Sequence, residues 1–167
     1  MLDEKEIVIK DACILFDLVD LNLLGVFFQL ALNSFTTPQV IGEITNEEQW
    51  VKISRYIDDR TLKIDDEGHF ETILEIYEKH PGLSIADSSV LELAIRKKAI
   101  IFSSDGSLRK ISTRNNLIVR GILWIIEELY KKEIISLDTV LNKLDMYTKI
   151  NQRAPKNEIQ KLILKLT

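Results

Sequence analysis

Short apolar runs alternate along the chain with longer segments in which apolar residues recur at helical spacing. Residues 7–9 and 99–102 are continuously apolar, which predicts strands covered on both faces of a sheet. Residues 33–36, 61–65 and 117–119 predict further strands, and the apolar–polar alternation of 61–65 is typical of a half-exposed or edge strand. Because parallel strands need crossover connections, the pattern predicts an α/β fold with a mainly parallel sheet of about five strands.

The intervals between these strands carry signals for helix starts and stops. Residues 14–32 predict one bent helix or two short ones. Thr37-Pro38 predicts the start of a helix that contains Glu43. The next helix is expected to run from Asn46 to near Asp59 and to bury Trp50, Ile53 and Ile57. Later helices are predicted from Phe70 to the His80-Pro81-Gly82 stop, from Ser84, from Ser107, and from Gly121 to about Tyr130.

The end of the chain, residues 136–167, predicts two helices separated by residues 151–155. Leu162, Ile163 and Leu166 give the last helix an apolar face that we expect to pack at a partner or dimer interface. We find no repeat and no linker that would split the chain. Residues 1–132 are therefore expected to form the main domain, with residues 133–167 as its helical extension.

Composition and charge narrow the class of protein. The chain has 167 residues, of which 46% are hydrophobic and 29% charged, as in a globular protein. A net charge of −4 argues against nonspecific binding of nucleic acid over the whole surface, so any such contact must be local. The single Cys13 excludes an internal disulfide, leaves no zinc set with the two histidines, and is expected to pack on an apolar face. Without a recognisable signal peptide or membrane span, we expect a cytoplasmic protein with no membrane contact.

Four acidic residues fall where a parallel sheet brings side chains together. Asp11 directly follows the first strand, and Asp105 follows the strand at 99–102. Glu43 is expected one turn into the helix capped by Thr37, and Asp87 in the first turn of the helix capped by Ser84. Ligands of parallel sheets bind beyond the carboxyl ends of the strands, and carboxylates crowded there repel one another unless a cation neutralises them. Oxygen ligands suit Mg²⁺ or Mn²⁺ rather than zinc.

Each acid also has an ordinary structural explanation. Asp87 can form a capping box with Ser84, and Glu43 can be a solvated helix residue. Asp105 before Gly106 is a natural turn, and Asp11 can cap the helix that follows it. Only the combination of four acids favours a metal site.

The motifs that carry these acids resemble those of PIN-domain nucleases, in the usual order. The resemblance covers roughly residues 7–130 and rests on five segments: IVIKDACILFDL, TTPQVIGEI, LSIADSSVLELA, IIFSSDGSLRK and IVRGILWIIEEL. The tail, including NQRAPKNEIQKLI, resembles the helical extension of a prokaryotic, VapC-type toxin-like subfamily. The resemblance implies a three-layer α/β/α sandwich in which residues 1–132 form the nuclease domain.

The same resemblance implies a function and its residues. It implies an endoribonuclease that uses Mg²⁺ or Mn²⁺, with RNA as substrate and the role of toxin in a bacterial toxin–antitoxin pair. An antitoxin protein and a second copy of the chain are then candidate partners. Gly106 stands where many relatives have another acid, which leaves open whether one or two ions bind. The catalytic and metal-binding residues would be Asp11, Glu43, Asp87 and Asp105, with Ser103 as the family's small hydroxyl residue.

Basic residues near the acids complete the expected site. Arg109 and Lys110 lie within two turns of Asp105 and are candidates to bind the substrate backbone. Residues 96–98 are better explained as a basic helix end. The reaction would be hydrolysis of a phosphodiester by a metal-activated water. A PIN-like scaffold that binds nucleic acid or protein without catalysis is the main alternative. A receiver-type signalling domain is disfavoured, because it needs a phosphate-accepting Asp after a middle strand and a lysine after a late one, and neither is clear in this sequence.

Overall fold

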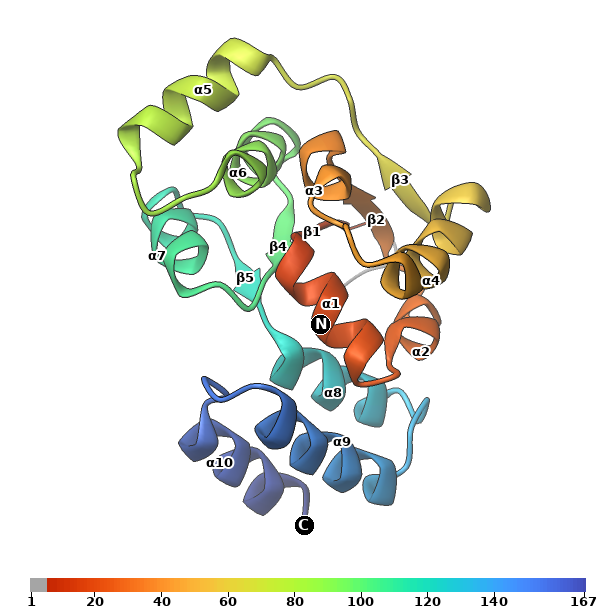
Figure 1. Ribbon diagram of the computed structural model, residues 1–167. Coiled ribbons are helices and arrows are strands. Elements are labelled where there is room, and N and C mark those ends of the chain that lie inside the picture. The colour runs from red at the N-terminus through yellow and green to blue at the C-terminus, as the bar shows by residue number, and fades with distance from the viewer. Residues whose placement is uncertain (1–5) are drawn as a thin grey trace.

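The computed structural model describes residues 6–167, which form a fully parallel five-stranded sheet with the order β3-β2-β1-β4-β5 (Figure 1). The pairing register places Val8 of the central strand opposite Ser34 on one side and Ile100 on the other. The strand predicted within residues 61–65 to be a half-exposed or edge strand lies at one edge of the sheet. The strands are β1 (Ile7–Lys10), β2 (Asn33–Thr36), β3 (Leu62–Ile64), β4 (Ile100–Phe102) and β5 (Val119–Arg120).

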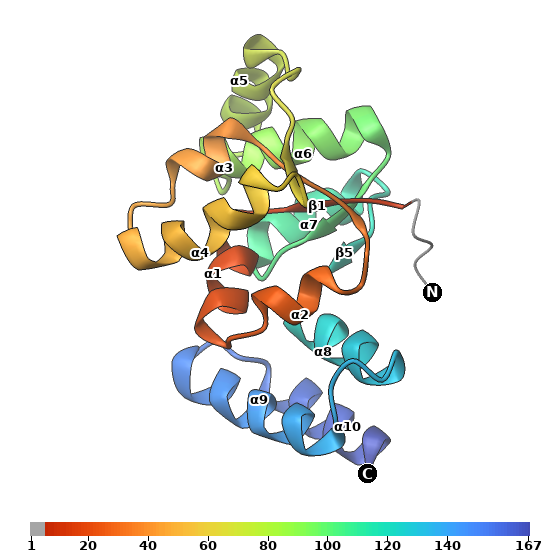
Figure 2. The ribbon, with the colours of Figure 1, turned by 90° about the vertical axis from the view of Figure 1, so that its right-hand side faces the viewer.

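Helices cover both faces of the sheet, which confirms the predicted three-layer α/β/α sandwich (Figures 1 and 2). One layer consists of helices that pack on one another beside β1 and β2: α1 (Ala12–Asp20), α2 (Leu24–Phe28), α4 (Glu47–Asp58) and α8 (Ile122–Lys131). The other layer is centred on α6 (Ile85–Lys97), against which pack α3 (Pro38–Gly42), α5 (Phe70–Lys79) and α7 (Gly106–Arg114). The apolar run after β1 thus forms two short helices.

The core lies where the central strands meet these layers. Val8, Ile9, Ile101 and Phe102 are completely buried, as continuous apolar runs in a doubly covered sheet predict. Burial of this kind is worth roughly 1.5–3 kcal/mol for each large aliphatic or aromatic side chain.

Lys10, the last residue of β1, is also completely buried, which its sequence context did not suggest. Its Nζ lies 4.5 Å from the centroid of the Phe27 ring and 5.8 Å from that of Phe102. Within residues 6–167 this amine has no hydrogen-bond partner. Burial lowers the pKa of Lys10 well below its ordinary value, because the charged form loses its hydration.

The tail forms the predicted pair of helices, α9 (Leu137–Ile150) and α10 (Lys156–Leu166), which pack against α8 on the side away from the sheet (Figures 1 and 2). The expectation of an uncovered apolar face on the last helix is wrong. Leu162 is buried, and Ile163 and Leu166 are half-buried against the core. Lys165 of α10 also pairs with Glu127 of α8. This face already packs within the chain and therefore gives no support for a dimer interface. A homodimer contact remains a prediction.

Several expected boundaries shift for identifiable reasons. The last strand comprises Val119–Arg120 rather than 117–119, because only these residues pair with β4. The helix after β4 begins at Gly106, because Asp105 rather than Ser107 accepts the N–H of Leu108 and caps it.

Two burial expectations also fail. Trp50 on α4 is 39% exposed, whereas Ile53 on the same helix is fully buried. Cys13 is exposed instead of packing in the core. Within the described part of the chain, no helix has the length and apolar character needed to cross a membrane.

Candidate functional site

Asp11 lies at the carboxyl end of β1, where the central strand passes into α1. Its side chain is 1% exposed. Oδ1 accepts the N–H of Ile14 at 2.8 Å and so caps α1, and Oδ2 accepts a short hydrogen bond from the hydroxyl of Ser103. Burial, with smaller contributions from the charges of Asp87 and Asp105, raises the pKa of this carboxyl to about 7, against the lowering effect of the two hydrogen bonds.

Ser103 links Asp11 to Asp105 across two neighbouring strands. Lys10 and Phe102 are register partners in the β1–β4 pair, so the residues that follow them leave the sheet side by side. The Ser103 hydroxyl donates to Asp11 and accepts the N–H of Asp105 at 2.9 Å. Asp105 Oδ1 in turn accepts the N–H of Leu108 at 2.7 Å. The two strand-end acids are therefore held in one hydrogen-bonded cluster.

Asp87 approaches this cluster from the first turn of α6. It forms the expected capping box, in which Ser84 and Asp87 each accept the other's backbone N–H at 3.0 Å. Partial burial raises the pKa of Asp87, and the charge of Asp105 contributes in the same direction. The capping explanation is thus correct, and Asp87 still lies close enough to Asp105 to be affected by its charge.

Glu43 lies further out than the sequence suggested. Helix α3 ends at Gly42, so Glu43 is the residue after the helix rather than within it, and it is exposed. Partial burial and the charge of Asp87 nevertheless raise the pKa of Glu43. Thr37 and Ser89 share a hydrogen bond of 2.7 Å that ties the start of α3 to α6, the helix that carries Asp87.

The acids of this cluster have no balancing positive side chain in the described part of the chain. Among residues 6–167, neither lysine nor arginine forms an ion pair with Asp11, Asp87 or Asp105. The negative charges of the same acids also act on the thiol of Cys13. Its partial enclosure raises its pKa to about 12, with contributions from the charges of Asp11, Asp105 and Asp87.

The donor set is chemically suited to a hard divalent cation. Oδ2 of Asp105 and Oδ1 of Asp87 accept no hydrogen bond from the described residues, so each carboxylate keeps an oxygen for a ligand. In the described part of the chain, no three His, Cys, Asp or Glu side chains already form a closed ligand set. Charge and oxygen chemistry therefore fit Mg²⁺ or Mn²⁺, while the arrangement needs side-chain movement to enclose an ion.

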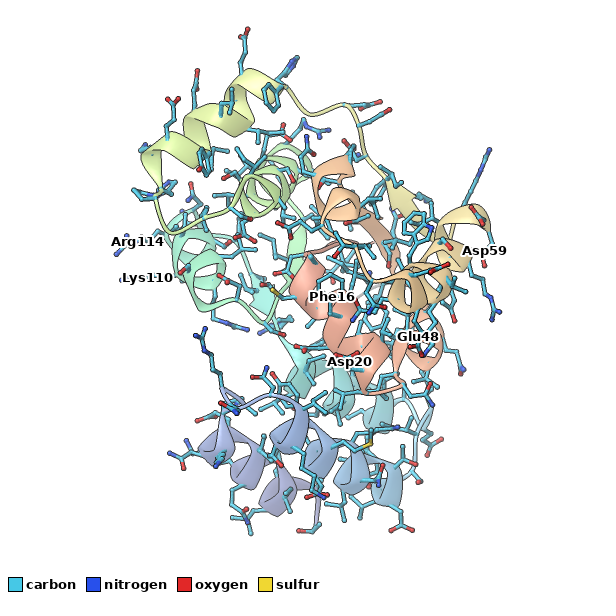
Figure 3. All side chains as sticks on the ribbon, in the orientation of Figure 1. Phe16, Asp20, Glu48, Asp59, Lys110 and Arg114 are labelled. Atoms are coloured by element: carbon cyan, nitrogen blue, oxygen red, sulfur yellow. The ribbon has the colours of Figure 1, made fainter. Side chains whose placement is uncertain are left out.

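A groove of about 900 Å³ opens beside the acids, between the α/β core and the tail. Cys13, Ser103 and Asp105 lie on its core wall, and Tyr147 and Arg153 lie on its tail wall. Arg109, a candidate for substrate binding from the sequence, lines the groove. Lys110 does not line it, and Figure 3 shows Lys110 on the outer side of α7, next to Arg114.

Sequence reasoning missed the polar cluster at the junction of core and tail. Ser104 donates to Asp17 of α1 at 2.7 Å. Burial raises the pKa of Tyr147 on α9, the charge of Asp17 adds to this shift, and the side chains of Ser104 and Asn151 oppose it. One signal was available for Asp17, because it lies four residues after Cys13 and thus on the same helix face.

Comparison with known proteins identifies the family. A family model described as a PIN domain (DUF3368) matches residues 7–167, almost the whole chain. The chain belongs to this PIN domain family. The PIN domain described above is also similar to the crystal structure of PAE2754 from Pyrobaculum aerophilum, with a TM-score of 0.51 and 16% identity over 69% of this chain and 90% of that one. At that identity the likeness concerns the fold alone. No curated protein matches the chain.

Proposed function

We propose that this PIN domain is an endoribonuclease that uses Mg²⁺ or Mn²⁺ to hydrolyse phosphodiester bonds of RNA. PIN domains are generally nucleases, and the family match covers nearly all of this chain. The acids Asp11, Asp87 and Asp105 would hold the metal, with Glu43 completing the set from the rim.

One observation carries this proposal: the pKa of Asp11 is raised to about 7 by its burial, by Asp87 and by Asp105. Asp11 is a buried carboxylate beside other acids with no ion-pair partner among residues 6–167, which is costly for the folded protein. A bound divalent cation would remove that cost. Perturbed groups of this kind cluster at functional sites, and this one lies at the carboxyl edge of a parallel sheet.

The protein's own residues would prepare the site for phosphodiester hydrolysis. Ser103 fixes the orientation of Asp11 and the backbone of Asp105 through its two hydrogen bonds. Arg109 lines the groove beside the acids. One of its guanidinium nitrogens donates to the carbonyl of Val119, and the remaining N–H groups would bind a backbone phosphate. When bound, a divalent metal lowers the pKa of a water and stabilises the charge that develops on the phosphate.

We further propose that the ribonuclease is the toxin of a bacterial toxin–antitoxin pair, of the VapC type. The support is the resemblance of its motifs and its helical tail to that subfamily. Induced expression of the parent should then arrest growth of a bacterial host, and an Asp105→Asn variant at equal level should not.

RNA cleavage in purified samples tests the nuclease directly. The parent should degrade single-stranded RNA with Mn²⁺ or Mg²⁺ and not with EDTA. Asp105→Asn should lose cleavage yet stay folded, because asparagine can still cap α7 through Leu108. Asp66→Asn, an exposed change of equal charge, should remain active. Undiminished cleavage by Asp105→Asn would remove that residue from the site.

A non-catalytic PIN scaffold is the second candidate. It is favoured by the hydrogen bonds of Asp11, both of whose oxygens already accept donors within the protein. The same samples separate the two functions. RNA binding without metal-dependent cleavage would support the scaffold and reject the nuclease.

A further inference from the structure

The groove beside the acids has walls from two distant parts of the chain. The core supplies the loop after β4 and the segment that connects β5 to α8, and the tail supplies Tyr147, Asn151, Arg153 and Glu158. Figures 1 and 2 both show α9 and α10 beneath α8, with the connection between them directed toward the core. The tail is therefore part of the surface next to Asp105, although its groove-lining residues follow Asp105 by more than forty positions.

Three arginines from three separate segments line this groove. Arg109 comes from α7, Arg120 from β5 and Arg153 from the connection between α9 and α10. Nε of Arg120 is buried and has no hydrogen-bond partner within residues 6–167. Its guanidinium lies over the Trp124 ring, 5.8 Å from the centroid. Because Nε is enclosed, it is the outer nitrogens of this ring-packed guanidinium that are suited to donate to a phosphate in the groove.

Aromatic side chains provide apolar surface between these charges. Phe16, Trp124 and Tyr147 all line the groove. Unpaired bases expose apolar faces that pack on such rings, whereas the bases of a duplex are hidden in its stack. Acidic residues also line the groove, with Asp17, Asp105 and Glu158 equal in number to the arginines. Binding must therefore depend on a few local contacts rather than on a broad basic surface.

We propose that this groove binds a single strand of RNA and that the helical tail contributes part of the substrate site through Arg153 and Tyr147. This inference rests on the proposed nuclease function for its substrate class. Arg109, Arg120 and Arg153 bind backbone phosphates, and the aromatic residues contact bases. The strand then passes directly over Ser103 and Asp105.

The number of arginines that contact phosphates determines how strongly the RNA affinity should depend on salt. With three phosphate contacts, log Kd should change with log salt concentration with a slope of about 2 for a single strand. Each arginine removed should lower that slope by about 0.7.

Binding is measured by fluorescence anisotropy with a labelled oligouridylate in EDTA, where no cleavage occurs. Arg153→Ala and Arg120→Gln should each weaken binding about fivefold near 50 mM salt and lower the slope as stated. The matched control is Arg114→Ala, which removes the same charge from α7 on a side that does not line the groove (Figure 3). The Arg114→Ala variant should keep an affinity and a salt slope near those of the parent. A duplex of matched length should bind more weakly than the single strand.

Tryptophan fluorescence reports whether the groove itself is occupied. The chain has two tryptophans, and a Trp50→Phe change leaves Trp124 as the only one. The oligonucleotide should change the emission of Trp124 with the same Kd as the anisotropy gives. Trp50 on α4 does not line the groove, so a parallel Trp124→Phe sample should show no such change.

The outcomes separate this inference from the nuclease function. Cleavage by the parent with unchanged binding in Arg153→Ala and Arg120→Gln would overturn the groove and leave the nuclease intact. Groove-dependent binding without cleavage would support the groove and overturn the nuclease. If the folded parent neither binds nor cleaves single-stranded RNA, both proposals are wrong.

Discussion

The cost of burying Asp11 can be measured as a change in stability on Asp11→Asn substitution in the absence of metal. Asparagine has nearly the same shape and can still accept the N–H of Ile14, so the cap of α1 is retained. What changes is the charge. Without a cation, the folded parent must hold a carboxylate that burial and two neighbouring acids make unfavourable.

The magnitude follows from the two pKa values of this carboxyl. In the unfolded chain it loses its proton near the ordinary value of 3.8, and in the folded protein it does so only at about 7. The folded state thus binds more protons between these values, and the parent loses stability as pH rises through that window. The loss reaches about 4 kcal/mol at pH 8 and stays under about 2 kcal/mol at pH 5.

The Asp11→Asn variant has no carboxyl at this position to titrate, so its free energy of unfolding must increase with pH relative to that of the parent. The hydrogen bond from Ser103 is altered by the substitution, and we expect a net gain of about 2–4 kcal/mol at pH 8. Subtracting the gain at pH 5 cancels the altered hydrogen bond and should leave about 2.5 kcal/mol. Urea unfolding in EDTA at both pH values gives these numbers, with Asp20→Asn on the same helix as an exposed control. An equal effect of Asp11→Asn at both pH values would show that the folded protein does not raise the pKa of Asp11.

Lys10 and Cys13 test the effects of burial and of the acid cluster on ionisation independently. Lys10→Met should stabilise the protein by about 1–3 kcal/mol at neutral pH, with the gain shrinking as pH approaches 10.5, where the unfolded lysine also loses its proton. Urea unfolding measures this, with the exposed Lys52→Met as control, and a destabilised Lys10→Met would show that the ring contacts favour the charged amine. Cys13 should react slowly with iodoacetamide at about pH 8, and saturating Mg²⁺ should speed the reaction by lowering its pKa. A rate unaffected by Mg²⁺ would argue against cation binding beside this thiol.

The sheet and most helices were predictable because their signals are local. Continuous apolar runs gave β1 and β4, and Thr37, Asn46 and Ser84 cap the expected helices. Convergence of Asp11 and Asp105 was also predictable, because parallel neighbouring strands end at the same edge.

The remaining features depend on tertiary packing. Lys10 looks like an exposed strand residue until α2 places Phe27 beside it. Glu43 falls outside α3, and Gly42, the last residue of that helix, is the local signal for its end, because glycine commonly marks helix ends. The groove combines Arg153 with Asp105, and their proximity is set by how the tail packs on α8, which periodicity does not encode.

Calorimetric titration with Mn²⁺ tests the central claim, a divalent-metal site at the acid cluster, without requiring the correct RNA. The parent should release or absorb heat that saturates, and Asp105→Asn should bind at least about tenfold more weakly. Near pH 6.5 the heat should also depend on the ionisation enthalpy of the buffer, because ligand binding displaces the proton that Asp11 retains up to about pH 7. A folded parent that gives no heat and no rise in Tm with Mn²⁺ would contradict the account.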